Sequence, residues 1–311
     1  KKDAAFHTIE PYLKNLIKKT EITMIATAET IRITSSDHGT QSVPDLRTIK
    51  TKMKATWEDG DYAGFATYME LGAIDILDGW NINNDVTLLD IGCGSGQSAI
   101  PAARSGRRVT GIDIADNLIE HARERARYEN LDARFDVGDA ENLPYEDNAF
   151  DVVISMIGAM FAPGYDSVAS EMGRVCRPGG RLHMANWTPD GFAATMFRCV
   201  ARYSPPAPGV QPPALWGVED VVIQRLGDDF TDFTLERKFY PRWTYPFSTS
   251  ELVELFRQKF GPVKRAFDSQ DRQGKNSLRA ELEDIYQAHN IASDGTTEIK
   301  GEYLNVSARR K

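Results

Sequence analysis

The apolar positions of this chain follow two periodicities, and these divide it into regions of different structure. From position 86 to position 187, short apolar runs rich in branched residues alternate with stretches whose apolar residues recur at helical spacing. The runs predict buried strands and the stretches predict helices, because side chains alternate along a strand and repeat every 3.6 residues along a helix. Such alternation is typical of βαβ units, which form a parallel sheet.

The expected elements follow directly from this pattern. The strands span residues 86–91, 108–113, 134–137, 150–156 and 181–187, and the helices between them span residues 97–104, 115–128 and 166–175. After residue 187 the alternation breaks. Helices are expected at residues 193–202, 249–260 and 277–290, and strand-like stretches lie at residues 233–240 and 302–308.

Amphipathic patterns ahead of the first strand predict helices there. Residues 3–19 form an amphipathic helix with lysines on much of its polar face, and residues 34–43 are a linker. Pro44 opens a second helix that stops at residues 58–61, and residues 62–77 form a third. The first of these helices has several interpretations: it packs on its own chain, pairs with another subunit or touches a membrane surface.

Large side chains, mostly aromatic, are concentrated in residues 189–247, where the sheet pattern is interrupted. They are Phe192, Met196, Phe197, Tyr203, Trp216, Phe230, Phe239, Tyr240, Trp243 and Tyr245. Two interpretations stand side by side. The segment is either a lid that shapes an apolar pocket over the carboxyl ends of the strands, or a small core of its own.

Composition narrows the classes of partner. The chain has 311 residues, 41% of them hydrophobic, and a net charge of −8. That charge argues against a nucleic acid, because phosphate contacts demand a basic face. No apolar run approaches the roughly 20 residues that cross a bilayer, so a cytoplasmic location without a membrane span is expected. The three cysteines, Cys93, Cys176 and Cys199, are too scattered for a disulfide framework or a metal site, and no metal is expected.

The first expected strand runs directly into a glycine loop, Gly92–Gly96. Glycines at alternate positions permit positive φ angles and let a ligand lie against bare backbone, and the helix that follows points its N–H groups at that ligand. The dinucleotide fingerprint G-x-G-x-x-G needs a glycine where this chain has Gln97. Asp90, just ahead of the loop, would repel a pyrophosphate. The loop therefore favours a ligand with positive charge.

The second expected strand ends at Asp113, 21 positions after Gly92. A carboxylate there accepts hydrogen bonds from both hydroxyls of a ribose. Dinucleotide enzymes use an acid in the same way, so Asp113 supports nucleoside binding without choosing between the two families. The alternative is an aspartate that only caps the next helix.

Several segments together resemble the class I S-adenosylmethionine-dependent methyltransferases, nearest the ubiquinone/menaquinone C-methyltransferase subgroup. Asp90-x-Gly92-x-Gly94-x-Gly96 resembles their first motif, and residues 138–144, 150–156 and 174–182 resemble later ones. The resemblance implies S-adenosylmethionine as cofactor. It also implies an α/β fold: a Rossmann-like, doubly wound, mostly parallel seven-stranded sheet of order 3-2-1-4-5-7-6, with N-terminal helices and a helical lid insertion.

The resemblance also divides the chain. Residues 1–43 hold the N-terminal helix and linker, residues 44–82 hold helices that cover the cofactor site, and residues 83–188 form the cofactor-binding core. Residues 189–311 carry the substrate lid and complete the sheet with an antiparallel hairpin. No homodimer contact is assigned, although a homodimer is compatible with this organisation.

The family's motifs assign cofactor contacts residue by residue. Asp139 and Ala140 receive the adenine edge, and the N-terminal helices close over the methionine end, where Tyr62 and Tyr68 face the site or else belong to the core. The expected cofactor-binding residues are Asp90, Gly92, Cys93, Gly94, Gly96, Gln97, Asp113, Ile114, Asp139, Ala140, Met156, Tyr62 and Tyr68.

The acceptor wall is expected at the carboxyl ends of the fourth and fifth strands, where open α/β sheets bind ligands. Its candidates are Met160, Phe161, Asn186, Trp187 and Trp216. No catalytic residue is assigned, because methyl transfer is an in-line displacement that chiefly needs alignment in a dry site. The expected function is methyl transfer to a small, partly apolar acceptor. A catalytically silent S-adenosylmethionine-binding module and a nicotinamide-dependent oxidoreductase are the alternatives.

Overall fold

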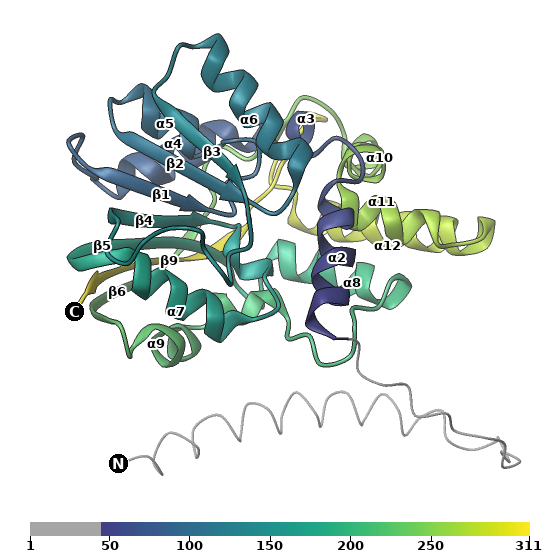
Figure 1. The fold of residues 1–311 in the computed structure, drawn as a ribbon. Coiled ribbons are helices and arrows are strands. Elements are labelled where there is room, and N and C mark those ends of the chain that lie inside the picture. Colours follow the sequence, from purple (N-terminus) through teal and green to yellow (C-terminus); the bar gives the residue numbers. More distant parts are fainter. Residues whose placement is uncertain (1–44) are drawn as a thin grey trace, which may run out of the picture. The chain divides into compact units, whose positions relative to one another are not determined.

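A seven-stranded sheet organises residues 45–311, the part of the chain that the computed structural model describes (Figure 1). The strand order is β3-β2-β1-β4-β5-β9-β6. The strands are β1 (Thr87–Ile91), β2 (Arg108–Asp113), β3 (Ala133–Val137), β4 (Phe150–Met156), β5 (Cys176–Trp187), β6 (Phe230–Phe239) and β9 (Glu302–Arg310). The expected helix at residues 3–19 and the linker after it lie outside the described residues.

Strands β1 to β5 pair in parallel, and β9 pairs antiparallel with both β5 and β6. The predicted fold class and strand order are therefore confirmed, with the last strand of the chain inserted between the fifth and sixth. In β1, Leu88, Leu89 and Ile91 have no exposed surface, because helices cover both faces of the sheet. This is why β1 is a continuous apolar run and not an alternating one.

Two pairs of helices cover the sheet. Helices α5 (Ala99–Arg104) and α6 (Asp116–Tyr128) contact each other and pack on β2 and β3, whereas α7 (Tyr165–Val175) and α9 (Glu219–Leu226) contact each other and pack on β4, β5 and β6 (Figure 1). All these strands and helices were expected near their observed positions except α9, which the sequence pattern missed.

The N-terminal helices are shorter and more broken than the sequence predicts. Helix α2 (Leu46–Trp57) begins after Asp45, whose side chain accepts a hydrogen bond from the Thr48 N–H at 2.7 Å. The single helix expected at residues 62–77 is instead α3 (Tyr62–Ala66), the 3₁₀ turn η1 (Thr67–Met69) and α4 (Glu70–Gly79).

Two insertions follow β5, and their helices other than α9 form a layer beside α2 and α3 (Figure 1). The first insertion holds α8 (Phe192–Tyr203), the 3₁₀ turn η3 (Pro213–Gly217) and α9. The second, between β6 and β9, holds α10 (Thr249–Lys259), α11 (Gly261–Asp268), α12 (Arg272–His289) and the short pair β7 (Thr244–Tyr245) and β8 (Thr297–Glu298). Helix α10 contacts α3, and α11 contacts both α2 and α8 (Figure 1). The sequence pattern missed α11, β7 and β8.

The ends of β1 and β4 meet through two glycines. A Cβ atom added at Gly158 would lie 2.3 Å from the Gly92 carbonyl oxygen, and one added at Gly92 would lie 2.7 Å from the Gly158 backbone. Only residues without a side chain permit this approach. A short 3₁₀ turn, η2 (Ala159–Phe161), follows at once and carries the chain away from β4.

We predict that Gly158→Ala destabilises the fold by about 1 to 3 kcal/mol, because the added methyl group has no room to move away from the Gly92 backbone. Gly79→Ala is the matched control: a Cβ there meets nothing within 4 Å at the end of α4, so this change is neutral or stabilises by up to about 1 kcal/mol. Urea denaturation measures both. Equal stability of the two variants would contradict the proposed backbone contact.

Candidate active site

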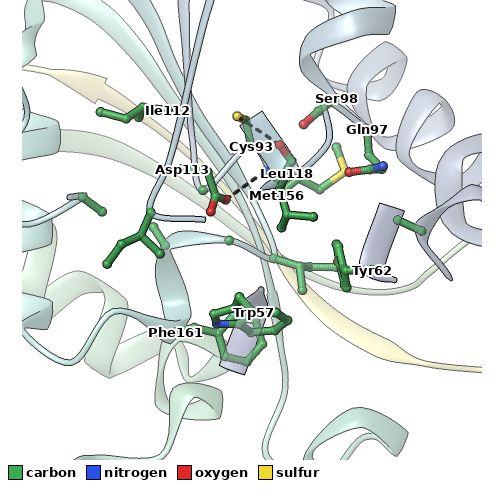
Figure 2. Close-up of a pocket in the computed structure, with 18 of the residues that line it drawn as sticks. Trp57, Tyr62, Cys93, Gln97, Ser98, Ile112, Asp113, Leu118, Met156 and Phe161 are labelled. Atoms are coloured by element: carbon green, nitrogen blue, oxygen red, sulfur yellow. Dashed lines mark hydrogen bonds between the residues drawn. The ribbon is translucent and has the colours of Figure 1, made fainter. Parts of the chain in front are cut away.

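A cavity opens at the carboxyl ends of β1, β2 and β4, and α2 and α3 cover it (Figure 2). Most of the lining comes from the ends of the strands and the segments that follow them: Gly92, Cys93, Gly94, Gln97, Ser98, Ile112, Asp113, Ile114, Leu118, Gly138, Asp139, Ala140, Met156, Ile157, Gly158, Ala159, Phe161 and Ala162. Met53, Trp57, Tyr62, Ala66, Met69, Ala73 and Tyr240 complete the lining. The cavity therefore lies at the point where the strand order reverses between β1 and β4.

The glycine loop uses its three glycines differently. All have positive φ, at +71° for Gly92, +54° for Gly94 and +87° for Gly96. A Cβ at Gly94 would meet only the Gln97 and Tyr62 side chains, at 3.3 and 3.6 Å, so the backbone there is open toward the cavity. A Cβ at Gly96 would instead lie 2.8 Å from Ile100 in α5. Gly96 shapes the turn but does not line the cavity.

Asp113 serves the loop, the helix and the cavity together. Its Oδ2 accepts a hydrogen bond from the Gly94 N–H at 2.9 Å, and its Oδ1 accepts one from the Ala115 N–H at 3.0 Å, just ahead of α6. Burial raises the pKa of this carboxyl, although those backbone donors oppose the shift. Asp113 therefore lines the cavity and holds the turn ahead of α6, whereas the N-cap of α6 is Ala115, with no side-chain cap hydrogen bond.

Asp90 lies behind the cavity wall. It has no exposed surface, its Oδ2 accepts a hydrogen bond from the Ser98 hydroxyl at 2.6 Å, and its Oδ1 has no partner within residues 45–311. Burial raises the pKa of Asp90 to about 7; the Ser98 hydrogen bond opposes this shift and the charge of Asp113 adds to it. Ser98 lines the cavity and Asp90 does not, so a cation in the cavity would act on Asp90 across Ser98.

Asp139 and Ala140 line the cavity beyond β3. The Asp139 Oδ1 atom accepts a hydrogen bond from the Glu141 N–H at 2.9 Å, and its Oδ2 accepts one from the Lys50 ammonium at 2.6 Å. The backbone of its own turn thus fixes this carboxylate, and a side chain from α2 reaches it as well.

Aromatic side chains form the opposite end of the cavity. The Trp57 ring lies 5.0 Å from Phe161 and 5.6 Å from Tyr62, measured between centroids, with edge-to-face packing in both pairs. Figure 2 shows Trp57 and Phe161 together, away from Asp113 and Cys93. The Tyr62 hydroxyl has no hydrogen-bond partner within the described residues, and burial with the nearby Asp113 charge raises the pKa of Tyr62 to about 12. Tyr62 therefore keeps its proton near neutral pH.

Most residues expected to bind cofactor do line the cavity: Gly92, Cys93, Gly94, Gln97, Asp113, Ile114, Asp139, Ala140, Met156 and Tyr62. Asp90 and Gly96 support it from behind. Tyr68 does not line it; its ring packs 5.0 Å from Tyr245.

Of the expected acceptor residues, only Phe161 lines the cavity. Met160, Trp187 and Trp216 are buried, and the Trp187 ring stacks on Trp243 at 5.2 Å. Asn186 is also buried, and neither atom of its amide has a hydrogen-bond partner in the described part of the chain. Among the large side chains of residues 189–247, Tyr240 alone lines the cavity, and most of the others join the hydrophobic core that also contains the sheet.

Sequence reasoning missed several lining residues on the covering helices, chiefly Met53, Trp57 and Met69. A signal existed for two of them, because Met53 and Trp57 share the apolar stripe of the second helix with Leu46 and Ile49. No signal pointed to Lys50, which meets Asp139 across 89 positions of sequence.

No helix within residues 45–311 has the length and apolar character to cross a membrane. The same residues contain no cluster of three or more metal-ligating side chains.

Comparison with known proteins agrees with this geometry. Residues 88–180 match the methyltransferase domain family. An uncharacterized protein of Mycobacterium tuberculosis is 35% identical over 272 residues, which cover 85% of this chain and 96% of that protein. The 27-O-demethylrifamycin SV methyltransferase of Amycolatopsis mediterranei is 42% identical over 118 residues, which cover 36% of this chain and 43% of that protein.

A solved structure shares the fold. A putative methyltransferase from Bacillus halodurans superposes with a TM-score of 0.52 at 19% identity, covering 76% of this chain and 97% of that chain. The matched domain begins in β1 and ends in β5, so it contains the glycine loop, Asp113 and Asp139. The chain belongs to the class I S-adenosylmethionine-dependent methyltransferases, and its cofactor is S-adenosylmethionine.

Proposed function

We propose that this protein transfers the methyl group of S-adenosylmethionine to a small, partly apolar acceptor held at the aromatic end of the cavity. The observation that carries the proposal is the division of one cavity into two ends. Both charged side chains of its described lining, Asp113 and Asp139, lie beside the strand ends, whereas Trp57 and Phe161 form the other end. Tyr62 lies between the two ends, near Gly94 and in contact with Trp57. One end suits a nucleoside and the other an apolar compound.

The residues present fit the cofactor. In our proposal Asp113 accepts hydrogen bonds from the ribose hydroxyls, Asp139 and Ala140 receive the adenine edge, and the open Gly94 backbone lies against the methionine part. Asp90 lies behind Ser98, and its Oδ1 has no partner among the described residues, so its charge stabilises the positive charge of a cofactor in the cavity. When bound, S-adenosylmethionine supplies a methyl group on a sulfonium that is already activated for displacement.

The protein's own contribution is alignment and exclusion of water. Trp57, Tyr62 and Phe161 come from α2, α3 and η2, so they surround an acceptor from three elements and keep the site apolar. Within residues 45–311 the lining holds no histidine, lysine, arginine or glutamate. Because Tyr62 keeps its proton near neutral pH, its hydroxyl can donate a hydrogen bond to the acceptor but does not act as a base, and the proton that the acceptor loses passes to solvent.

The relatives support a range of acceptors. The name 27-O-demethylrifamycin SV methyltransferase describes methylation of an oxygen, and that protein is 42% identical to this chain over 36% of its length. A hydroxyl on a largely apolar compound is therefore one acceptor to test, beside amines and thiols. That the partner is a small molecule and not a nucleic acid remains a prediction from the sequence, which is also compatible with a homodimer.

Turnover tests the proposal directly. Purified protein with S-adenosylmethionine and a panel of apolar phenols, alcohols, amines, thiols and quinols should release S-adenosylhomocysteine with at least one class, as measured by mass spectrometry. Phe161→Ala, which opens the aromatic end, should raise the KM for that acceptor more than the KM for S-adenosylmethionine. Cofactor binding without release of S-adenosylhomocysteine across the panel would favour the catalytically silent module.

We predict that Asp113→Ala weakens S-adenosylhomocysteine binding by about 2 to 3 kcal/mol, which is about 30- to 150-fold, because the ribose hydroxyls lose a charged acceptor. Calorimetry measures the affinity. Asp132→Ala, which removes an exposed acid just ahead of β3, is the control and should bind normally. A folded Asp113→Ala variant with unchanged affinity would show that Asp113 only supports the glycine loop and the turn ahead of α6.

Because Asp90 is buried, we predict that cofactor affinity and the free energy of unfolding depend on pH. Because its pKa in the folded protein is about 7, the carboxylate becomes charged between pH 6 and pH 8, and affinity for the cationic cofactor should rise over that range. Asp90→Asn should flatten the rise. Since the folded state holds this proton at pH values where the unfolded state has lost it, the free energy of unfolding falls as pH rises from about 4 to 7, and Asp90→Asn should remove that fall. Identical pH profiles for both proteins would contradict the assignment.

A further inference from the structure

The two halves of helix α2 differ in the hydrogen bonds and ion pairs that they make with the rest of the protein. None of its residues is buried, although Met53 and Trp57 line the cavity. Its second half is held by several contacts: Arg265 donates to the Ala55 carbonyl at 2.8 Å, and Lys54 pairs with Asp116 at 2.9 Å. The apolar face of the helix therefore looks into the cavity, and a ligand there would complete its burial.

The first half of α2 has one polar attachment. Within the described part of the chain, the hydrogen bonds and ion pairs from residues 45–52 to any other element all belong to Lys50. Its ammonium lies 2.6 Å from Asp139 Oδ2 and 2.7 Å from Glu141 Oε2. The Glu141 side chain is only 3% exposed and that of Lys50 is 18% exposed, so water screens this group weakly.

The two carboxylates are fixed without Lys50. Glu141 Oε1 accepts a hydrogen bond from the Gly164 N–H at 2.7 Å, and Asp139 Oδ1 accepts one from the Glu141 N–H at 2.9 Å. They form a ready acceptor for one cation. Burial lowers the pKa of Lys50, but its hydrogen bonds to both acids raise it, and the net shift is upward, so the ammonium stays charged.

Asp139 is shared between two sides. It lines the cavity, and it also lines a shallow depression outside it together with Arg47, Lys50 and Thr51. Lys50 is absent from the cavity lining, so it approaches Asp139 from the outer side. The Asp139 carboxylate can therefore contact a ligand inside the cavity while it binds the Lys50 ammonium outside it.

We propose that Lys50 is a positioning residue that couples docking of the first half of α2 to occupation of the cavity at Asp139. This inference rests on the proposed placement of adenine at Asp139. A ligand that contacts Asp139 and covers Met53 and Trp57 stabilises the docked helix. By reciprocity, the docked helix raises the affinity for that ligand.

Binding of S-adenosylhomocysteine tests the inference without turnover. Lys50→Met should weaken binding about tenfold in calorimetry, within the usual range for coupled sites. Lys52→Met removes an exposed lysine from the same helix and should bind like the parent, while Lys50→Arg should recover most of the affinity.

Hydrogen exchange separates coupling from simple support of the helix. In the parent protein, S-adenosylhomocysteine should slow exchange of the amides of residues 46–57, and in Lys50→Met this slowing should be largely lost for residues 46–52. The double variant Lys50→Met with Glu141→Gln should lose less affinity for S-adenosylhomocysteine than the two single variants lose in sum, because both side chains belong to one cluster.

Equal affinity and equal ligand-dependent protection in Lys50→Met and Lys52→Met would overturn the inference. Loss of unfolding free energy in Lys50→Met with unchanged protection by the ligand would do the same, because Lys50 would then only support the helix. A Lys50 effect on binding, in a protein that methylates no acceptor, would keep this inference and reject the proposed function.

Discussion

Two backbone segments touch where β1 and β4 end, and the shape of the cavity depends on that contact. Gly92 and Gly158 approach so closely that neither tolerates a side chain. The Ser155 hydroxyl strengthens the junction, since it donates to the Ile91 carbonyl at 2.7 Å and accepts from the Ala159 N–H at 2.9 Å. The glycine loop follows Ile91 and η2 follows Gly158, so both begin at this junction, and both line the cavity.

This arrangement separates two tasks in space. The strand ends carry the acids and open backbone that suit a nucleoside, and they are rigid because the sheet beneath them is buried on both faces. The aromatic end is built from α2, α3 and η2; α2 has no buried residue, whereas α3 and η2 each bury two. In the proposed function the strand ends recognise the cofactor, and the covering elements exclude water.

The parallel core could be predicted from sequence because its signals are local. A buried strand, a glycine loop and an acid at the end of the next strand each occupy a few neighbouring positions, and Asp113 followed from them. Asp139 was predicted from the resemblance of residues 138–144 to a methyltransferase motif. Contacts between distant positions gave no such signal. Lys50 reaches Asp139 across 89 positions, and helix α11 follows directly on α10 with a proline in its first turn, so its boundary depends on packing against α2 and α8.

The aromatic residues after β5 show the same limit. Their composition was compatible with a lid over the pocket or with a separate core, and only packing distinguishes the two. Trp187, Trp243 and Phe192 pack on one another, with ring centroids 5.2 and 5.4 Å apart, while Trp57 from the N-terminal side supplies the aromatic wall instead. Composition could indicate apolar surroundings near the site but not which segment provides them.

A crystal structure of the protein with S-adenosylhomocysteine tests the central claim of one cavity with two different ends. The account predicts the ribose hydroxyls within hydrogen-bonding distance of Asp113, the adenine edge at Asp139 and Ala140, and the sulfur atom facing Trp57, Tyr62 and Phe161. A sulfur atom turned away from these aromatic side chains, or a ribose distant from Asp113, would contradict it.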